Sequence, residues 1–157
     1  MSHQDGIIFR LAEPGDALAL ADLRWRLKTD DSSDFSMMEK NDFVAAFTES
    51  VLKGQDERFF HWVADLEGRL IAVMSVHKVR KLPSPEHLDS CWGYLTNCYT
   101  LPDYRNCGIG TNLMSALKGW AKEQRFELLV VWPSDRSCAF YERSGFRRYA
   151  DPLVLEI

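Results

Sequence analysis

The sequence contains no apolar run long enough to cross a membrane. A transmembrane helix needs about 20 consecutive, predominantly apolar residues, and charged or polar residues interrupt every stretch of this 157-residue chain before that length. The first ten residues also lack the basic flank and apolar core of a secretory signal. We therefore expect a cytoplasmic protein.

Cysteine, glycine and proline are scarce. The four cysteines, at positions 91, 98, 107 and 138, form no CxxC pair and no Cys/His metal-ligand spacing, so we expect free thiols and no metal. The 9 glycines and 6 prolines are too few for a collagen-like or disordered chain. Apolar residues make up 46% of the sequence, which predicts a single compact domain over residues 1–157.

An excess of positive charge is also absent. With 19 basic and 23 acidic residues, the formal net charge is −4 at pH 7. Nucleic acids and anionic lipid surfaces bind proteins largely through clustered lysines and arginines. We therefore expect neither a nucleic acid nor a membrane to be a partner.

The hydrophobic pattern predicts an α/β domain with a mixed sheet. Strands are predicted at residues 7–11, 59–65, 69–78, 91–101, 126–132, 146–149 and 153–157, and helices at 16–28, 36–53, 109–124 and 137–143. The strand–helix–strand unit over residues 91–132 predicts a right-handed crossover between parallel strands. We therefore expect six or seven strands flanked by about four helices that cover both faces of the sheet.

The most specific local pattern is the loop Arg105-Asn106-Cys107-Gly108-Ile109-Gly110-Thr111, between a predicted strand and a predicted helix. N–H groups in the first turn of a helix have no intrahelical acceptor and bind anions such as phosphate. Glycine lets a phosphate approach the backbone, and Arg105 adds a positive charge. The loop is neither a dinucleotide fingerprint nor a P-loop, because Leu113 occupies the third glycine position and no GxxxxGK string exists.

Two motifs make the chain similar to the GNAT-type N-acetyltransferase superfamily. The stretch Arg105-x-x-Gly108-x-Gly110 resembles the family's Arg/Gln-x-x-Gly-x-Gly/Ala motif between its fourth strand and third helix. Residues 141–146, Tyr-Glu-Arg-Ser-Gly-Phe, resemble its C-terminal Tyr-Glu-Lys/Arg-x-Gly-Phe element. The resemblance is strong over residues 91–149, agrees only in element order over the first 60 residues, and implies a GNAT-like acyl-CoA N-acyltransferase fold.

The resemblance implies that acetyl-CoA is the acetyl donor, and that an amine attacks it directly in a ternary complex. Backbone N–H groups of the loop would hold the pyrophosphate, and the edge of the fourth strand would pair with the pantetheine arm. Many relatives have asparagine where this chain has Ser134. The cofactor-binding residues implied are Tyr99, Thr100, Leu101, Arg105, Asn106, Cys107, Gly108, Ile109, Gly110, Thr111, Ser134 and Arg143.

The resemblance also implies catalytic roles. Tyr141 would donate a proton to the leaving thiolate. The family's fourth strand often carries a glutamate as general base, whereas this one carries none; Asn97 would orient a water or the substrate. The base is left open among His77, Glu86, His87, Asp89 and a water chain. The alternative function is a catalytically silent acyl-CoA-binding sensor on the same fold.

The first two predicted helices, their connection and the loop at residues 81–90 would frame the acceptor site. Apolar walls and acidic groups there favour a small cationic amine. The residues are Trp25, Phe35, Met37 and Met38 for the walls and Asp30, Asp31 and Asp34 for the charge.

The apolar strand predicted at 153–157 indicates a homodimer if it reaches an edge or a partner strand. The alternative is that it pairs within its own sheet.

Overall fold

The computed structural model describes residues 6–30, 34–53, 58–149, 153, 155 and 156. Five strands and four α-helices make up the described chain. In chain order they are β1 (Ile7–Leu11), α1 (Ala17–Thr29), α2 (Met37–Lys53), β2 (Phe59–Leu66), β3 (Arg69–Arg80), β4 (Cys91–Thr100), α3 (Ile109–Glu123), β5 (Phe126–Val131) and α4 (Cys138–Arg143). These bounds agree with the sequence predictions to within about two residues for the first nine elements.

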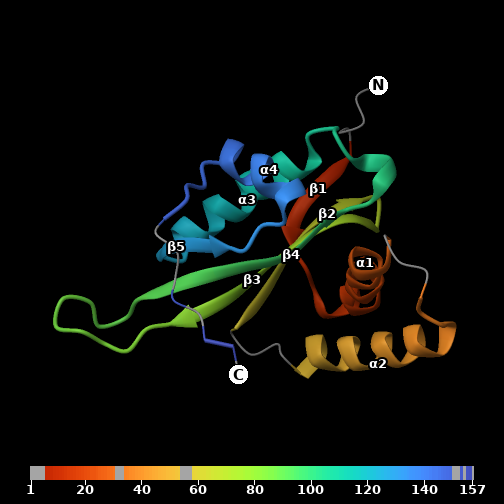
Figure 1. The fold of residues 1–157 in the computed structure, drawn as a ribbon, viewed down its shortest axis with the longest axis horizontal. Coiled ribbons are helices and arrows are strands. Elements are labelled where there is room, and N and C mark those ends of the chain that lie inside the picture. The colour runs from red at the N-terminus through yellow and green to blue at the C-terminus, as the bar shows by residue number, and fades with distance from the viewer. Residues whose placement is uncertain (1–5, 31–33, 54–57, 150–152, 154, 157) are drawn as a thin grey trace.

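The five strands form one mixed sheet in the order β1-β2-β3-β4-β5. The first four are antiparallel neighbours, and β5 runs parallel to β4 after the α3 crossover, which confirms the predicted parallel unit. α1 packs against β3 and β4, whereas α3 packs against β1, β2, β3 and β5. Helices therefore cover both faces of the sheet, with α2 outside α1 and α4 beside α3 (Figure 1).

The prediction of six or seven strands is wrong for the described residues. Phe146–Tyr149 is irregular, and so are positions 153, 155 and 156, while the rest of the predicted last strand lies outside the described residues. A strand needs a neighbour for its N–H and C=O groups, and the described sheet ends at β5. Leu153 and Leu155 are 104% and 83% exposed, so they pack on no described partner. The homodimer stays a prediction.

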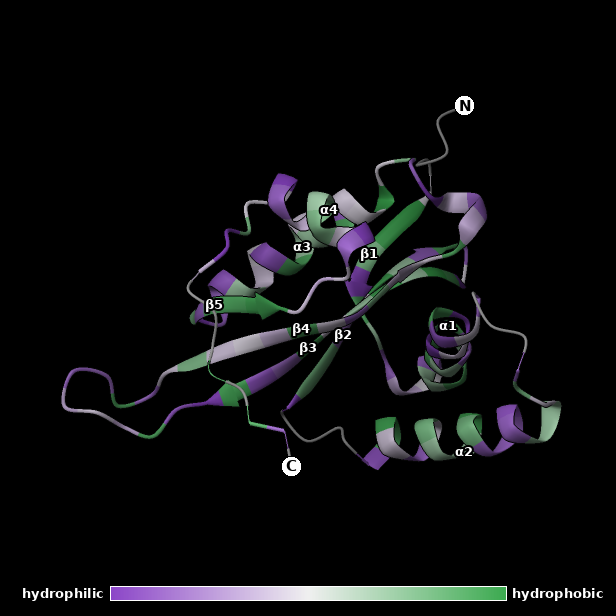
Figure 2. Ribbon diagram, viewed as in Figure 1, coloured by the Kyte–Doolittle hydropathy of each residue, from purple (hydrophilic) through white to green (hydrophobic). Residues whose placement is uncertain are grey.

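The core lies on both faces of the sheet. On one face it is formed with α3, whose buried stripe includes Ile109, Leu113, Leu117 and Ala121, and on the other with α1, which buries Leu20 and Leu23. Each of the larger side chains contributes about 1.5–3 kcal/mol by leaving water. Figure 2 shows hydrophobic residues concentrated in strands such as β1 and β5, with hydrophilic residues on the outer turns of α3 and α4. Gly93 on β4 is required for close packing, because a Cβ there would lie 2.6 Å from the Leu129 side chain.

Local signals in the sequence set the ends of two elements. The capping box that opens α2 is formed: the Ser36 N–H donates to Glu39 Oε2 at 2.6 Å, and the Glu39 N–H donates to Ser36 Oγ at 3.2 Å. The β2–β3 turn has Glu67 and Gly68 at φ 51° and 87°, the left-handed pair that a two-residue hairpin needs.

Candidate functional site

A bulge in β4 organises the centre of the molecule. The β3–β4 register passes from Ser75 opposite Thr96 to Val73 opposite Tyr99, so β4 contains one extra residue in this interval. Asn97 lies there with φ 53°. A bulge shifts the alternation of side chains beyond it by one position. Consequently Cys98 faces α4, and Tyr99 faces α1.

The β4 and β5 strands separate just beside this bulge. Their parallel pairing runs from Cys91 opposite Phe126 to Leu95 opposite Val131. β4 then continues to Thr100, whereas β5 ends at Val131. The edge of β4 from Thr96 onward therefore has no strand partner on the β5 side within the described chain. This opening, which we call the slot, leaves backbone groups available to an extended ligand.

The glycine loop leads from the slot into α3. Gly108 is the residue before the helix and has φ 78°, a conformation that favours glycine. The first helical hydrogen bond runs from the Asn112 N–H to the Gly108 carbonyl at 3.0 Å. The N–H groups of Ile109, Gly110 and Thr111 consequently have no acceptor inside the helix. This arrangement is suited to an anion.

The two glycines of the loop serve different purposes. Gly108 permits the left-handed turn. A Cβ at Gly110 would lie 3.4 Å from the Phe140 ring, so this glycine brings α3 close to α4. We expected both glycines to leave room for a phosphate. At Gly110, however, a Cβ would meet the Phe140 ring.

Arg105 is tied to the end of α1. Its Nε donates to the Thr100 carbonyl at 2.9 Å, and its guanidinium lies 3.4 Å from the Asp30 carboxylate and 5.4 Å from the centre of the Tyr99 ring. The Tyr99 hydroxyl also donates to Asp30. Burial, with the Asp30 bond, raises the pKa of Tyr99 to about 12. Asp30, expected to attract a cationic acceptor, is thus already engaged by two side chains; Asp31 lies outside the described residues.

Tyr141 lies on α4, against the part of β4 that follows the bulge. Its ring packs edge-on against Phe140 and Phe146, with centroid distances of 5.2 and 5.5 Å. Its hydroxyl lies beside the Cys98 thiol. Burial, reinforced by Cys98, raises the pKa of Tyr141 above its ordinary value. The phenol therefore stays protonated at neutral pH and is able to donate a proton.

Asn97 ends a polar chain that crosses three strands. Its Nδ2 donates to Ser75 Oγ at 3.0 Å, and Ser75 Oγ lies 2.7 Å from His61 Nδ1. The direction of the Ser75–His61 bond is set by the tautomer of His61, because the Ser75 hydroxyl is able both to donate and to accept a second bond. Burial lowers the pKa of His61, which favours the neutral imidazole. Asn97 Oδ1 is buried without a hydrogen-bond partner among the described residues.

Sequence reasoning missed Ser75 and His61. Both stand as polar residues within strongly apolar strands, and that was the available signal. Their contact depends on the β2–β3 register, in which His61 is opposite Ser75. The sequence alone does not fix that register.

The remaining predicted cofactor residues lie around the slot, some bonded within the fold and others exposed. Thr100 ends β4, and the Leu101 N–H is bound to the Ile71 carbonyl at 2.9 Å. Ser134 follows β5 on the other side of the slot and is exposed, with its Oγ 3.0 Å from Ser137 Oγ. Arg143 is exposed at the end of α4, two residues after Tyr141.

The suggested bases in the β3–β4 connection do not approach the bulge. Residues 81–90 project beyond the sheet (Figure 1). Asp89 precedes Asn97 by eight extended residues, which corresponds to roughly 25 Å of strand. His77 is stacked on Phe59, with ring centroids 4.5 Å apart.

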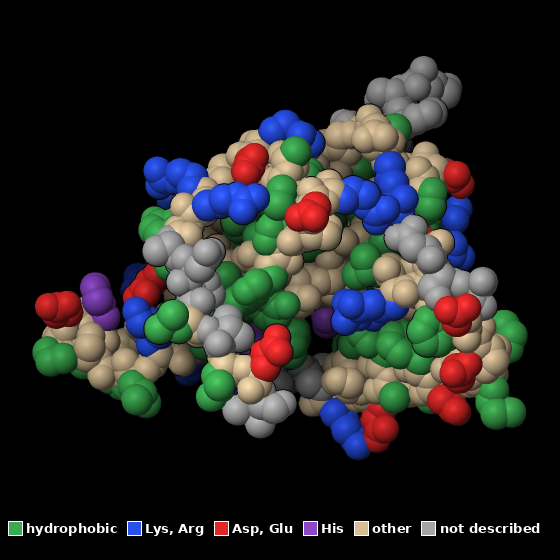
Figure 3. Space-filling model, viewed as in Figure 1, with side chains coloured by type: hydrophobic (Ala, Val, Ile, Leu, Met, Phe, Trp, Pro, Cys, Tyr) green, Lys and Arg blue, Asp and Glu red, His purple; other side chains and the backbone are tan. Residues whose placement is uncertain are grey.

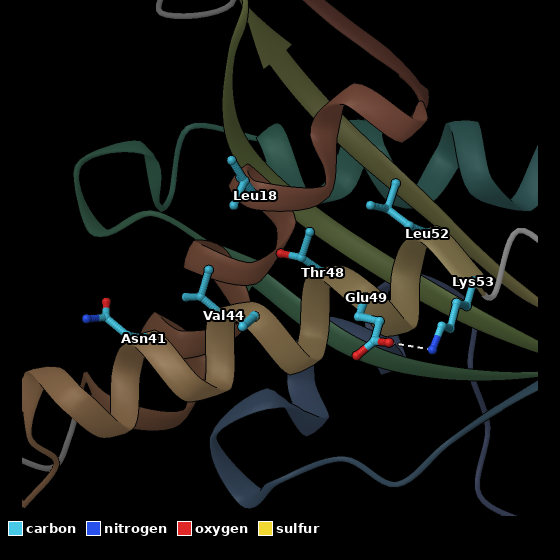
Figure 4. Close-up of a pocket in the computed structure, with 8 residues that line it drawn as sticks. Leu18, Asn41, Val44, Thr48, Glu49, Leu52 and Lys53 are labelled. Carbon is cyan, nitrogen blue, oxygen red and sulfur yellow. Dashed lines mark hydrogen bonds and ion pairs between the residues drawn. The ribbon is translucent and has the colours of Figure 1, made fainter.

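A shallow apolar depression lies elsewhere, between α1 and α2. Figure 4 shows Leu18 of α1 facing Val44, Thr48 and Leu52 of α2, with the Glu49–Lys53 ion pair at its rim. On the face seen in Figure 3, hydrophobic side chains gather along α2, with acidic side chains at its end. The depression shares no residue with the slot or the glycine loop.

Of the apolar residues expected to wall the acceptor site, Trp25 packs against aromatic rings of α2 and of the segment before it. The Trp25 ring lies 5.5 Å from both Phe35 and Phe43. Met37 and Met38 are exposed at the start of α2.

No helix in the described ranges is long and apolar enough to span a membrane. The described residues also contain no group of His, Cys, Asp and Glu side chains that would hold a metal ion.

Comparison with known proteins gives a family and a set of similar structures. The model of the acetyltransferase (GNAT) family matches residues 18–146. A predicted acetyltransferase from Clostridium acetobutylicum, solved with acetyl-CoA, superposes with a TM-score of 0.74 at 23% identity, covering 96% of each chain. No curated protein sequence matches.

Two further structures are similar in fold at lower identity. Glucosamine-6-phosphate N-acetyltransferase from Arabidopsis thaliana has a TM-score of 0.69 at 17% identity and covers 96% of this chain and 97% of its own. An aminoglycoside acetyltransferase from an uncultured soil metagenomic sample, in complex with sisomicin, has a TM-score of 0.65 at 15% identity and covers 98% of this chain and 95% of its own.

Proposed function

The chain belongs to the acetyltransferase (GNAT) family, and on that premise we propose that it transfers the acetyl group of acetyl-CoA to an amine by direct attack in a ternary complex. The observation that carries the proposal is the meeting of three features at one end of β4: the slot, the open N-terminus of α3 and the buried Tyr141. A ligand that combines a phosphate with an extended arm fits this combination.

The residues fit the donor along its length. The N–H groups at the start of α3, with the left-handed Gly108 before them, suit a pyrophosphate. The edge of β4 from Thr96 to Thr100, which has no strand partner on the β5 side in the described chain, suits a ligand chain that carries amide groups, because such a chain accepts and donates backbone-like hydrogen bonds. We assign the first contact to residues 105–111 and the second to Tyr99, Thr100 and Leu101. Ser134 and Arg143 are proposed as flanking contacts.

Tyr141 is proposed as the proton donor. When bound, acetyl-CoA supplies an acetyl group activated as a thioester, and a thiolate is the leaving group. The raised pKa of Tyr141 keeps its phenol protonated at assay pH. A phenol that lies beside Cys98, directly after the β4 bulge, is positioned at the edge of the slot. General acid assistance of this kind is typically worth about 10²–10⁴-fold in rate.

Asn97 is proposed to orient the reacting amine or an intervening water. Its Oδ1 has no partner in the described structure, and a buried acceptor without a donor costs about 1–3 kcal/mol. A donor that arrives with the substrate would remove this cost. The neutral His61, through Ser75, holds the amide in the orientation that leaves Oδ1 available.

The acceptor is proposed to be an amine. Two of the similar structures are named for acetylation of an amino sugar phosphate and of aminoglycosides, and one of them holds sisomicin. Release of free CoA thiol from acetyl-CoA, measured over a panel of amines, tests the proposal. We expect at least one amine to give saturable thiol release and an acetylated product by mass spectrometry. Acetyl-CoA binding with no turnover on any amine would favour the silent sensor.

A further inference from the structure

An arginine occupies the sheet-facing stripe of α1. Ala17, Leu20 and Ala21 are buried in this helix, and Arg24 follows Leu20 and Ala21 at spacings of four and three. Residues at these spacings share one face of a helix. That face packs against β3 and β4. Arg24 is accordingly half-buried, although arginines of surface helices usually lie in solvent.

The acidic residues of α1 are engaged by other cations. Asp22 pairs with Arg26 at 2.8 Å and with Lys40 at 3.1 Å, and the Asp30 carboxylate is bound by Arg105. Among the described residues Arg24 has no ion pair. A half-buried guanidinium without a counter-charge loses part of its favourable hydration free energy, and no ion pair offsets the loss. Burial accordingly lowers the pKa of Arg24 from the ordinary value. A charge kept at this cost commonly marks a ligand site.

Arg24 lies at the α1 side of the slot. Its guanidinium interacts electrostatically with the Tyr94 phenol of β4. The Tyr94 ring meets the Trp132 ring edge-on at 5.1 Å, and Trp132 directly follows Val131, the last residue of β5 paired with β4. Cys98 and Tyr141 are on the opposite face of the sheet. Arg24 therefore adjoins Tyr94 on the α1 face of the sheet, close to the point where β4 and β5 separate.

A guanidinium presents a planar fork of donors that matches a carboxylate or phosphate in two parallel hydrogen bonds. It repels an ammonium group. We propose that Arg24 binds an anionic group, a carboxylate or a phosphate, on the acceptor, so that the substrate class is an amine that also carries a negative charge. The inference rests on the proposed acetyl transfer. It reverses the cationic acceptor expected from the acidic residues between the first two helices.

Matched acceptor pairs test the inference. Phenylalanine with its carboxamide isolates a carboxylate, and glucosamine 6-phosphate with glucosamine isolates a phosphate. We compare wild type with Arg24→Met, which keeps an apolar stem but removes the charge, and with Arg24→Lys, which keeps the charge. Lys28→Gln is the control, because it removes one positive charge from an exposed position one turn further along α1.

For the anionic member of at least one pair, Arg24→Met should raise KM about tenfold or more with kcat nearly unchanged, since a charged hydrogen-bonded contact is worth that much. For the member of each pair that lacks the anionic group, the KM of Arg24→Met should stay within about threefold of wild type. The KM of Lys28→Gln should do so for both members. Arg24→Lys should recover part of the loss. The melting temperature of Arg24→Met should equal or exceed that of wild type, because the uncompensated charge is gone.

Equal losses on both members of each pair would overturn the inference. So would a lower melting temperature with unchanged discrimination, which indicates a structural arginine. If no amine releases CoA thiol, the proposed function fails, and an NMR titration then decides the inference separately. The Arg24 Nε–Hε resonance should shift with phenylalanine or glucosamine 6-phosphate and not with their neutral partners; no shift with either anion would refute it.

Discussion

The Tyr141 hydroxyl of α4 faces the Cys98 thiol of β4. This pair exists because the bulge at Asn97 shifts the side-chain alternation of β4 by one position. Without the extra residue, Tyr99 would occupy the face toward α4, and Cys98 would face α1. One inserted residue therefore decides which groups face the slot from each side of the sheet.

The Cys98 thiol should react slowly in the native protein. Burial raises its pKa to about 11, so only about one part in a thousand is thiolate near pH 8, and the thiolate is the reactive form. Alkylation by iodoacetamide, followed by peptide mass spectrometry, should label Cys98 far more slowly in native than in denatured protein. Labelling at the same rate in both states would contradict the raised pKa of this thiol.

Replacing Tyr141 by phenylalanine should affect turnover more than binding. Phenylalanine keeps the ring contacts with Phe140 and Phe146 and removes only the hydroxyl. With an identified acceptor, we expect kcat to fall at least about tenfold, with acetyl-CoA affinity within a few-fold of wild type. Tyr149→Phe is the matched control, because that side chain is 84% exposed. Unchanged kcat in Tyr141→Phe would point to water as the proton donor.

The raised pKa of Tyr141 also predicts the alkaline side of the pH profile. A phenol loses its donor form only above its pKa, and here that pKa lies above the ordinary value of about 10. Ionisation of Tyr141 should therefore cause no loss of kcat below about pH 10. This behaviour is read in the same steady-state experiment, carried out at several pH values.

Gly108→Val should weaken acetyl-CoA binding without unfolding the domain. Gly108 has φ 78°, which a β-branched residue adopts only with strain. The loop before α3 would have to rearrange, and we expect the dissociation constant for acetyl-CoA to rise at least about tenfold. Gly119→Ala is the control within α3: its Cβ would meet no atom within 4 Å, and it should stabilise the helix by about 0.5–1 kcal/mol. Wild-type affinity in Gly108→Val would show that the loop is not the phosphate site.

Gly93→Ala should destabilise the fold. The added Cβ would lie 2.6 Å from Leu129 and 2.8 Å from Val76, so the packing between β4 and its neighbours must shift. Overpacking of this kind typically costs about 1–3 kcal/mol, which urea denaturation measures as a lower midpoint. Gly15→Ala, whose Cβ would meet no atom within 4 Å, should leave the midpoint nearly unchanged. Equal midpoints for both variants would contradict the close approach at Gly93.

The sequence indicated the features that depend on neighbouring residues. The helix after the glycine loop and the parallel crossover were predicted from such local signals. The bulge at Asn97 was not, because it depends on the pairing of β4 with β3. The strands predicted after Gly145 fail for a related reason, since the described segment finds no partner in the sheet.

The roles of the charged residues near the first two helices could be assigned only from the tertiary structure. The acidic residues after α1 suggested a free negative surface, but Asp30 binds Arg105 and Tyr99. Sequence analysis did not single out Arg24, and its position on the buried stripe of α1 shows that it faces the sheet. Residue type is local information, whereas the partner of a charge is set by packing.

Titration calorimetry of the wild-type protein with acetyl-CoA, in the presence of EDTA, tests the central claim most directly. Two temperatures are needed, because a binding enthalpy that is zero at one temperature changes with the heat capacity. We predict one saturable site with a dissociation constant of roughly 1 μM–1 mM, the range typical of enzyme substrates. Heats that stay at the dilution level up to millimolar acetyl-CoA at both temperatures, with the protein shown to be folded, would contradict the account.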